Sequence, residues 1–128
     1  MASLPEWEWL VKVADAEVRR TLKALPPELR QAAEALPVTY EPMPAAALIE
    51  EGLDPDTLGL FIGGDHDEEA HTVLPPRIIL YLENIWCMVD EENGDEADYR
   101  AEVRTTLLHE LGHYLGLDED ELTERGLE

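Results

Sequence analysis

The chain has one cysteine, few basic residues and no long hydrophobic run, and each shortage excludes a class of protein. Because Cys87 stands alone, no internal disulfide can form. No apolar run approaches the roughly 18 residues that a membrane-spanning helix needs. The first residues contain Glu6 and Glu8 but no positive charge, unlike the start of a secretory signal. We therefore predict a cytoplasmic protein without a membrane partner.

The shortage of basic residues leaves a formal net charge of −21, from 9 Lys and Arg against 30 Asp and Glu. Such a field repels nucleic acid and anionic membranes, so we predict that neither is a partner. The same field attracts metal ions and basic peptides. A simpler interpretation is that the acidity serves only solubility.

The length of 128 residues predicts one domain over residues 1–128. Helical spacing of apolar residues predicts a long N-terminal helix, capped by Ser3, and a long helix near the C-terminus. The predicted helices cover residues 5–24, 27–35, 45–51, 96–115 and 118–124. The predicted strands cover residues 38–43, 59–62 and 77–86, with loops over 65–71 and 90–98.

The segment His109-Glu110-Leu111-Gly112-His113 has the H-E-x-x-H spacing, which is typical of a zinc site. With each helical residue advancing about 100°, His113 lies only about 40° from His109 and one turn further along. Both imidazoles can therefore reach one Zn²⁺ ion, at about 2.0–2.1 Å. Glu110 falls about 100° from His109, beside the metal, where it can hold a water molecule.

The rest of this helix supports the interpretation. An apolar arc lies away from the histidines and is suited to packing on a sheet. Its members are Val103, Leu107, Leu108, Leu111, Tyr114 and Leu115. Small residues near the histidines, Thr106, Gly112 and Gly116, leave room for a metal and a substrate. The alternative, a surface helix with two incidental histidines, requires a chance match of about one in a hundred or less.

A catalytic zinc site usually has three protein ligands. Gly116 follows His113 by three residues and can turn the chain back in a left-handed conformation. Glu119, three residues later, is therefore the predicted third ligand. Its neighbours Asp118 and Asp120 are close alternatives.

The segment His109–Leu117 resembles the small bacterial zincin-like metallopeptidases, described as minimal metzincin-like domains. A weaker match of pattern covers Gly59-Leu60-Phe61 and Pro76–Tyr81. The resemblance implies an α+β, zincin-like fold. In that fold a small mixed sheet with an edge strand near the cleft packs against an active-site helix and an N-terminal helix. This chain differs from full metzincins in having Glu119 where histidine is usual and no methionine after His113.

Two functions are consistent with these residues. The first is a zinc-dependent peptide hydrolase in which Glu110 is the general base. Its peptide or protein substrate would pair with an edge strand, either 77–82 or 59–62. The alternative is a zinc-stabilised peptide- or protein-binding module with little turnover. The oligomeric state does not follow from the sequence.

Other residues with reactive or metal-binding side chains are further candidates for the site. His66 and His71 are most simply solvated loop residues, with a second metal site as the alternative. Cys87 is interpreted as a small core residue. Tyr81 and Tyr99 are both candidates to stabilise an oxyanion.

Overall fold

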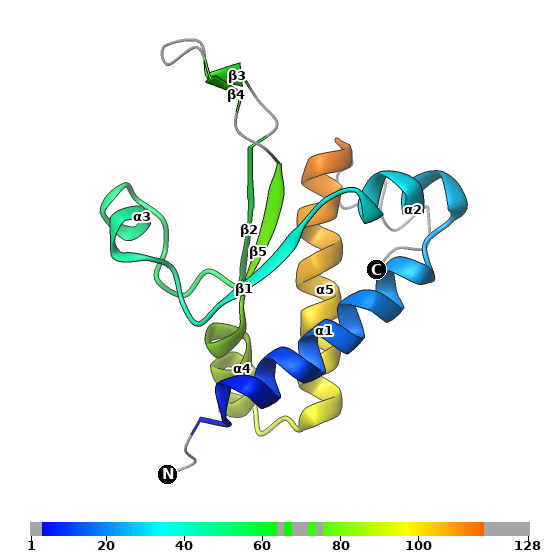
Figure 1. Cartoon of the computed structure of the whole chain (residues 1–128). Helices are drawn as coiled ribbons and strands as arrows, with labels where there is room; N and C mark the ends of the chain where they lie inside the picture. Colours follow the sequence, from blue (N-terminus) through cyan, green and yellow to red (C-terminus); the bar gives the residue numbers. More distant parts are fainter. Residues whose placement is uncertain (1–3, 64–65, 68–71, 74–75, 117–128) are drawn as a thin grey trace.

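The computed structural model describes residues 4–63, 66–67, 72–73 and 76–116 of the chain (Figure 1). These residues form five helices and five short strands. The elements are α1 (Trp7–Lys23), α2 (Pro27–Glu34), β1 (Val38–Glu41), α3 (Ala46–Glu50), β2 (Gly59–Ile62), β3 (His66–Asp67), β4 (Thr72–Val73), β5 (Arg77–Tyr81), α4 (Leu82–Glu91) and α5 (Glu96–Leu115). The predicted α+β architecture is therefore confirmed. None of the described helices is long and apolar enough to cross a membrane.

The main sheet has three strands in the order β1-β5-β2. β1 runs parallel to β5, whereas β2 runs antiparallel to it, with Phe61 opposite Ile78. The sheet lies alongside α5, and α1 crosses that helix (Figure 1). β5 is thus the central strand and β2 an edge strand on the side of α5.

The hydrophobic core lies between the sheet and the two long helices. From β5, Ile78 and Leu80 project into it, whereas Ile79 and Tyr81 project from the opposite face of the sheet. The helices contribute the buried residues Leu10, Val13, Ala14, Val18, Tyr99, Val103, Leu107 and Leu111. The apolar arc predicted for α5 therefore packs as expected.

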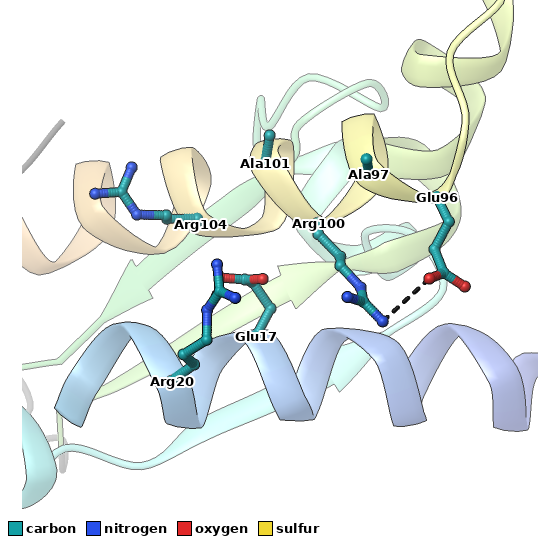
Figure 2. Close-up of a pocket in the computed structure, with 7 residues that line it drawn as sticks. All are labelled: Glu17, Arg20, Glu96, Ala97, Arg100, Ala101 and Arg104. Atoms are coloured by element: carbon teal, nitrogen blue, oxygen red, sulfur yellow. Dashed lines mark ion pairs between the residues drawn. The ribbon is translucent and has the colours of Figure 1, made fainter. Parts of the chain in front are cut away.

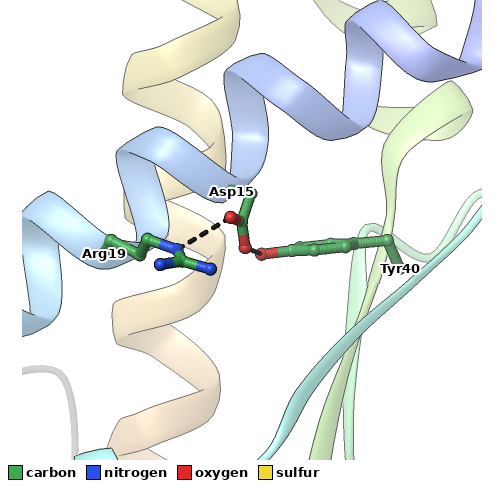
Figure 3. Close-up of polar contacts among 3 residues, drawn as sticks. All are labelled: Asp15, Arg19 and Tyr40. Atoms are coloured by element: carbon green, nitrogen blue, oxygen red, sulfur yellow. Dashed lines mark hydrogen bonds and ion pairs between the residues drawn. The ribbon is translucent and has the colours of Figure 1, made fainter.

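A polar contact connects α1 to β1 at the margin of this core (Figure 3). The Tyr40 hydroxyl donates a hydrogen bond of 2.9 Å to the carboxylate of Asp15. Arg19 approaches the same carboxylate at 2.8 Å. Burial of the Tyr40 ring and this hydrogen bond raise the pKa of its hydroxyl, so it stays a donor at neutral pH.

Three predicted elements were wrong in detail. The strand predicted over 77–86 ends at Tyr81, and α4 begins at Leu82, because Leu82, Ile85 and Val89 form a buried helical face. The segment predicted as a loop over 65–71 contains β3, which pairs with β4. α1 begins at Trp7 with Glu6 as its N-cap and no side-chain cap, two residues later than predicted. Ser3 and the helix predicted over 118–124 lie outside the described residues.

Candidate metal centre

The local sequence at both ends of α5 fixes the register of the H-E-x-x-H segment. At the start, the Asp95 side chain accepts a hydrogen bond of 3.1 Å from the backbone N–H of Asp98. The Asp98 side chain in turn accepts one of 3.0 Å from the backbone N–H of Asp95. At the end, Gly116 is left-handed, with φ 72°. The predicted cap, helix end and glycine conformation are therefore confirmed.

The two histidines lie together on the exposed side of α5. The ring centroids of His109 and His113 are 4.7 Å apart, with an angle of 59° between the planes. The His113 side chain is 55% exposed, and His109 is exposed as well. Two imidazoles so close on an open helix face provide two nitrogen donors suited to one zinc ion.

Glu110 has a very different environment from the histidines, since it is only 6% exposed. Its Oε1 lies 3.5 Å from Nδ1 of His113, and its carboxylate accepts a hydrogen bond from the backbone N–H of Phe61 in β2. Burial raises the pKa of Glu110, an effect that His113, His109 and the Phe61 N–H partly oppose. A raised pKa makes this carboxylate a stronger base than an ordinary exposed glutamate, and it lies beside two potential metal ligands.

The edge of β2 explains why Glu110 is covered. The N–H of Tyr81 donates to the C=O of Leu58 at 2.9 Å. In an antiparallel pair only every second residue of a strand hydrogen-bonds to its neighbour, so Leu58, Leu60 and Ile62 pair with β5 and the residues between them do not. The register then directs the backbone groups of Gly59 and Phe61 toward the free edge, where the Phe61 N–H meets Glu110. The free edge of the sheet therefore lies directly beside the H-E-x-x-H segment.

Gly59 allows β2 to approach α5 this closely. A Cβ atom at position 59 would lie 2.6 Å from Cγ2 of Thr106 and 3.4 Å from Cγ of Glu110. Real Cβ atoms essentially never show the first of these distances. The sequence predicts Gly59 only as part of a strand, although a glycine inside a strand often marks such a close approach.

We expect Gly59→Ala to lower the free energy of unfolding by about 1–3 kcal/mol, because the added methyl group overpacks the contact with Thr106. Thr106→Ser removes the Cγ2 methyl group and should restore most of the loss when combined with Gly59→Ala. Urea denaturation of the two single variants and the double variant measures both effects. Equal stability of Gly59→Ala and wild type would show that β2 does not pack as described.

A groove of about 280 Å³ opens beside the histidines, between α5 and the start of β2. It is lined by Leu58, Gly59, Glu102, Thr105, Thr106, His109 and Glu110. Small side chains and a glycine therefore leave space on the N-terminal side of His109. Of the three small residues predicted to leave room, only Thr106 lines this groove, and Gly112 is buried.

The structure removes both tyrosine candidates from the site. Tyr99 is buried against α1, where its hydroxyl donates to the C=O of Leu10 at 2.9 Å. Tyr81 projects from the sheet face opposite α5. Neither hydroxyl is directed toward Glu110, so neither tyrosine serves as an oxyanion donor there.

Cys87 and the two loop histidines are the remaining candidates from the sequence. Cys87 was predicted to be a core residue, but it is exposed on α4, because the buried face of that helix is formed by Leu82, Ile85 and Val89. Partial burial of the thiol and three nearby carboxylates raise its pKa, which disfavours a nucleophilic role. His66 starts β3, and His71 lies outside the described residues.

The third ligand predicted from the sequence is not tested by the structure. Asp118, Glu119 and Asp120 all lie outside the described residues. Within residues 4–63, 66–67, 72–73 and 76–116, no group of three or more His, Cys, Asp or Glu side chains is arranged to hold a metal ion. The histidine pair fits two positions of a zinc site, for which three protein ligands are usual.

A comparison with known protein families shows where this chain belongs. The model of the zincin-like metallopeptidases matches residues 33–127, which include the sheet, α4 and the whole H-E-x-x-H helix. The chain belongs to the zincin-like metallopeptidase family. No curated protein matches it. In this zincin α1 and most of α2 precede the matched region. α1 nevertheless supplies much of the core.

Proposed function

We propose that this zincin is a zinc-dependent peptidase in which His109, His113 and Glu119 hold the metal and Glu110 is the general base. The observation that carries the proposal is the position of Glu110, buried under the edge of β2 and 3.5 Å from His113. When bound, zinc supplies a Lewis acid that polarises a carbonyl group and makes water more acidic.

The environment of Glu110 suits proton transfer. Its carboxylate takes the proton of the attacking water and passes it to the leaving amine. Burial raises the pKa of Glu110 and so strengthens it as a base, while the Phe61 N–H holds the carboxylate in place. Because Glu110 points to β2 rather than outward with the histidines, it acts as a base and not as a ligand.

The edge of β2 is the proposed binding site for an extended peptide substrate. An extended peptide adds to this edge by main-chain hydrogen bonds with the outward N–H and C=O of Gly59 and the outward C=O of Phe61, since the Phe61 N–H already donates to Glu110. Residues 77–82, the other strand considered from the sequence, cannot serve because β5 is paired on both sides. A peptide bound in this way has a peptide bond next to Glu110.

A cleavage assay on a peptide library tests the proposed activity. Zinc-loaded protein should cleave a subset of peptides, and a chelator should remove the activity, which zinc then restores. Peptide binding without turnover would favour the alternative of a zinc-stabilised binding module. Chelator-resistant cleavage would contradict a zinc-dependent mechanism.

For the third ligand, we expect Glu119→Ala to weaken zinc binding far more than Asp118→Ala or Asp120→Ala. Gly116 has the left-handed conformation that can turn a chain back after a helix, and a single carboxylate of the three is expected to face the ion. Glu119→His should keep binding, because imidazole is an equally good zinc ligand. Zinc titration of the four variants measures these effects. A larger loss of zinc affinity at position 118 or 120 would show that the third ligand is that residue and not Glu119.

A further inference from the structure

Glu102 occupies the groove that leads away from the histidines. It precedes His109 by seven residues, so the two side chains lie on nearly the same face of α5, about 10 Å apart along the helix axis. Both line the groove of about 280 Å³, with Thr105 and Thr106 between them. An extended peptide spans that separation with about three residues.

The charges around Glu102 distinguish it from the other charged residues of α5. Its side chain is half-buried, and its pKa is raised first by burial and then by the neighbouring carboxylate of Glu92. Both causes act in the same direction. An ionised carboxylate in this environment gains most from a cation brought by a ligand.

The basic residues of α5 lie on its other side. Arg100 and Arg104 line a separate groove between α1 and α5 (Figure 2). In that groove Arg100 pairs with Glu96 at 3.0 Å. The helix therefore separates its charges, with arginines toward α1 and Glu102 toward the candidate active site.

Negative charge continues beyond Leu58. A second cavity, of about 330 Å³, shares Leu58 with the first and is lined also by Asp56 and Glu91. A peptide lying along this side of the molecule therefore passes acidic groups both at Glu102 and past Leu58. The formal net charge of −21 adds a long-range attraction for cations.

We infer that Glu102 determines substrate specificity by binding a cationic group of the peptide, a Lys or Arg side chain or a free N-terminal amine, within about three residues of the cleaved bond. The inference rests on the proposed peptidase function, since it uses the same groove. Its chemistry is a carboxylate–ammonium or carboxylate–guanidinium pair in a partly dehydrated groove, where such a pair is stronger than on an open surface.

Binding to zinc-loaded Glu110→Gln protein tests the inference without requiring turnover. Fluorescence anisotropy compares peptides of one sequence that carry Lys or Gln at a single position, each with a free or an acetylated N-terminus. We expect cationic peptides to bind about tenfold more tightly than the neutral peptide. The acetylated Lys peptide and the free-amine Gln peptide show which cation is recognised.

Adding Glu102→Gln should abolish this tenfold preference, whereas Glu28→Gln, the same charge change on an exposed site of α2, should keep it. The Glu102→Gln change should not lower the free energy of unfolding, because its ionised form is disfavoured in the folded state. Zinc titration verifies that the metal site is intact.

A preference that survives Glu102→Gln, or equal binding of cationic and neutral peptides, would overturn the inference. Cleavage of neutral peptides as fast as cationic ones would overturn it too, and would leave the peptidase function standing. Absence of cleavage by the wild type, with the binding preference present and lost in Glu102→Gln, would instead contradict the peptidase function alone.

Discussion

Glu110→Gln is expected to bind zinc like the wild type and to lose peptide hydrolysis by a factor of about 10²–10⁴. Glutamine keeps the size of the side chain and retains an oxygen that accepts the hydrogen bond from the Phe61 N–H. It cannot accept a proton from water at neutral pH. The loss therefore appears in kcat, while the metal content and the fold stay unchanged.

Two comparisons make this result interpretable. Glu28→Gln removes the same charge far from the groove and should keep full activity. His109→Ala should lose the metal. If Glu110→Gln loses zinc as completely as His109→Ala, Glu110 is a ligand and its assigned role is wrong. If it cleaves peptides as fast as wild type, the activity has another origin.

The second large effect is on stability. A zinc concentration one hundred times the Kd should stabilise the wild type by about 2.7 kcal/mol, because the metal binds only the folded chain. His109→Ala and His113→Ala should remove this zinc-dependent gain, measured for each variant against its own metal-free form. Thermal unfolding with and without zinc measures the shift.

His71→Ala is the matched control for the histidine variants, since it removes an imidazole outside the H-E-x-x-H segment. The zinc-dependent rise in Tm should persist in this variant. An equal rise in His109→Ala and in wild type would show that zinc stabilises the protein from another site.

The helix that carries the motif could be predicted from sequence because its determinants are local. Asp95 and Asp98 cap each other within one turn, and Gly116 ends the helix through its own backbone conformation. The stagger of His109 and His113 follows from helical geometry alone. The positions of the two imidazole rings relative to each other could therefore be predicted without knowing the sheet.

α4 was missed because its sequence suits two structures. Residues 77–86 are rich in Ile, Leu and Tyr, which favours a strand throughout. The helical pattern of Leu82, Ile85 and Val89 becomes decisive only when these side chains pack against α5 and the core. A short apolar run does not by itself distinguish a strand from a buried helix.

The environment of Glu110 could not be predicted because it depends on strand order. The sequence left residues 59–62 and 77–82 as equal candidates for the edge, and only the pairing of β5 on both sides resolves them. With β2 at the edge, its Phe61 N–H reaches Glu110, and Thr106 and Glu110 become buried although they were expected on the open side of α5. In the sequence, only the glycine at position 59 indicated that β2 and α5 approach closely.

Calorimetric titration of zinc into metal-free protein tests the central claim most directly. The wild type should bind about one zinc ion per chain with micromolar or tighter affinity, and His109→Ala and His113→Ala should each abolish that binding. No binding by the wild type at micromolar zinc, or unchanged binding in both histidine variants, would contradict a metal centre on α5.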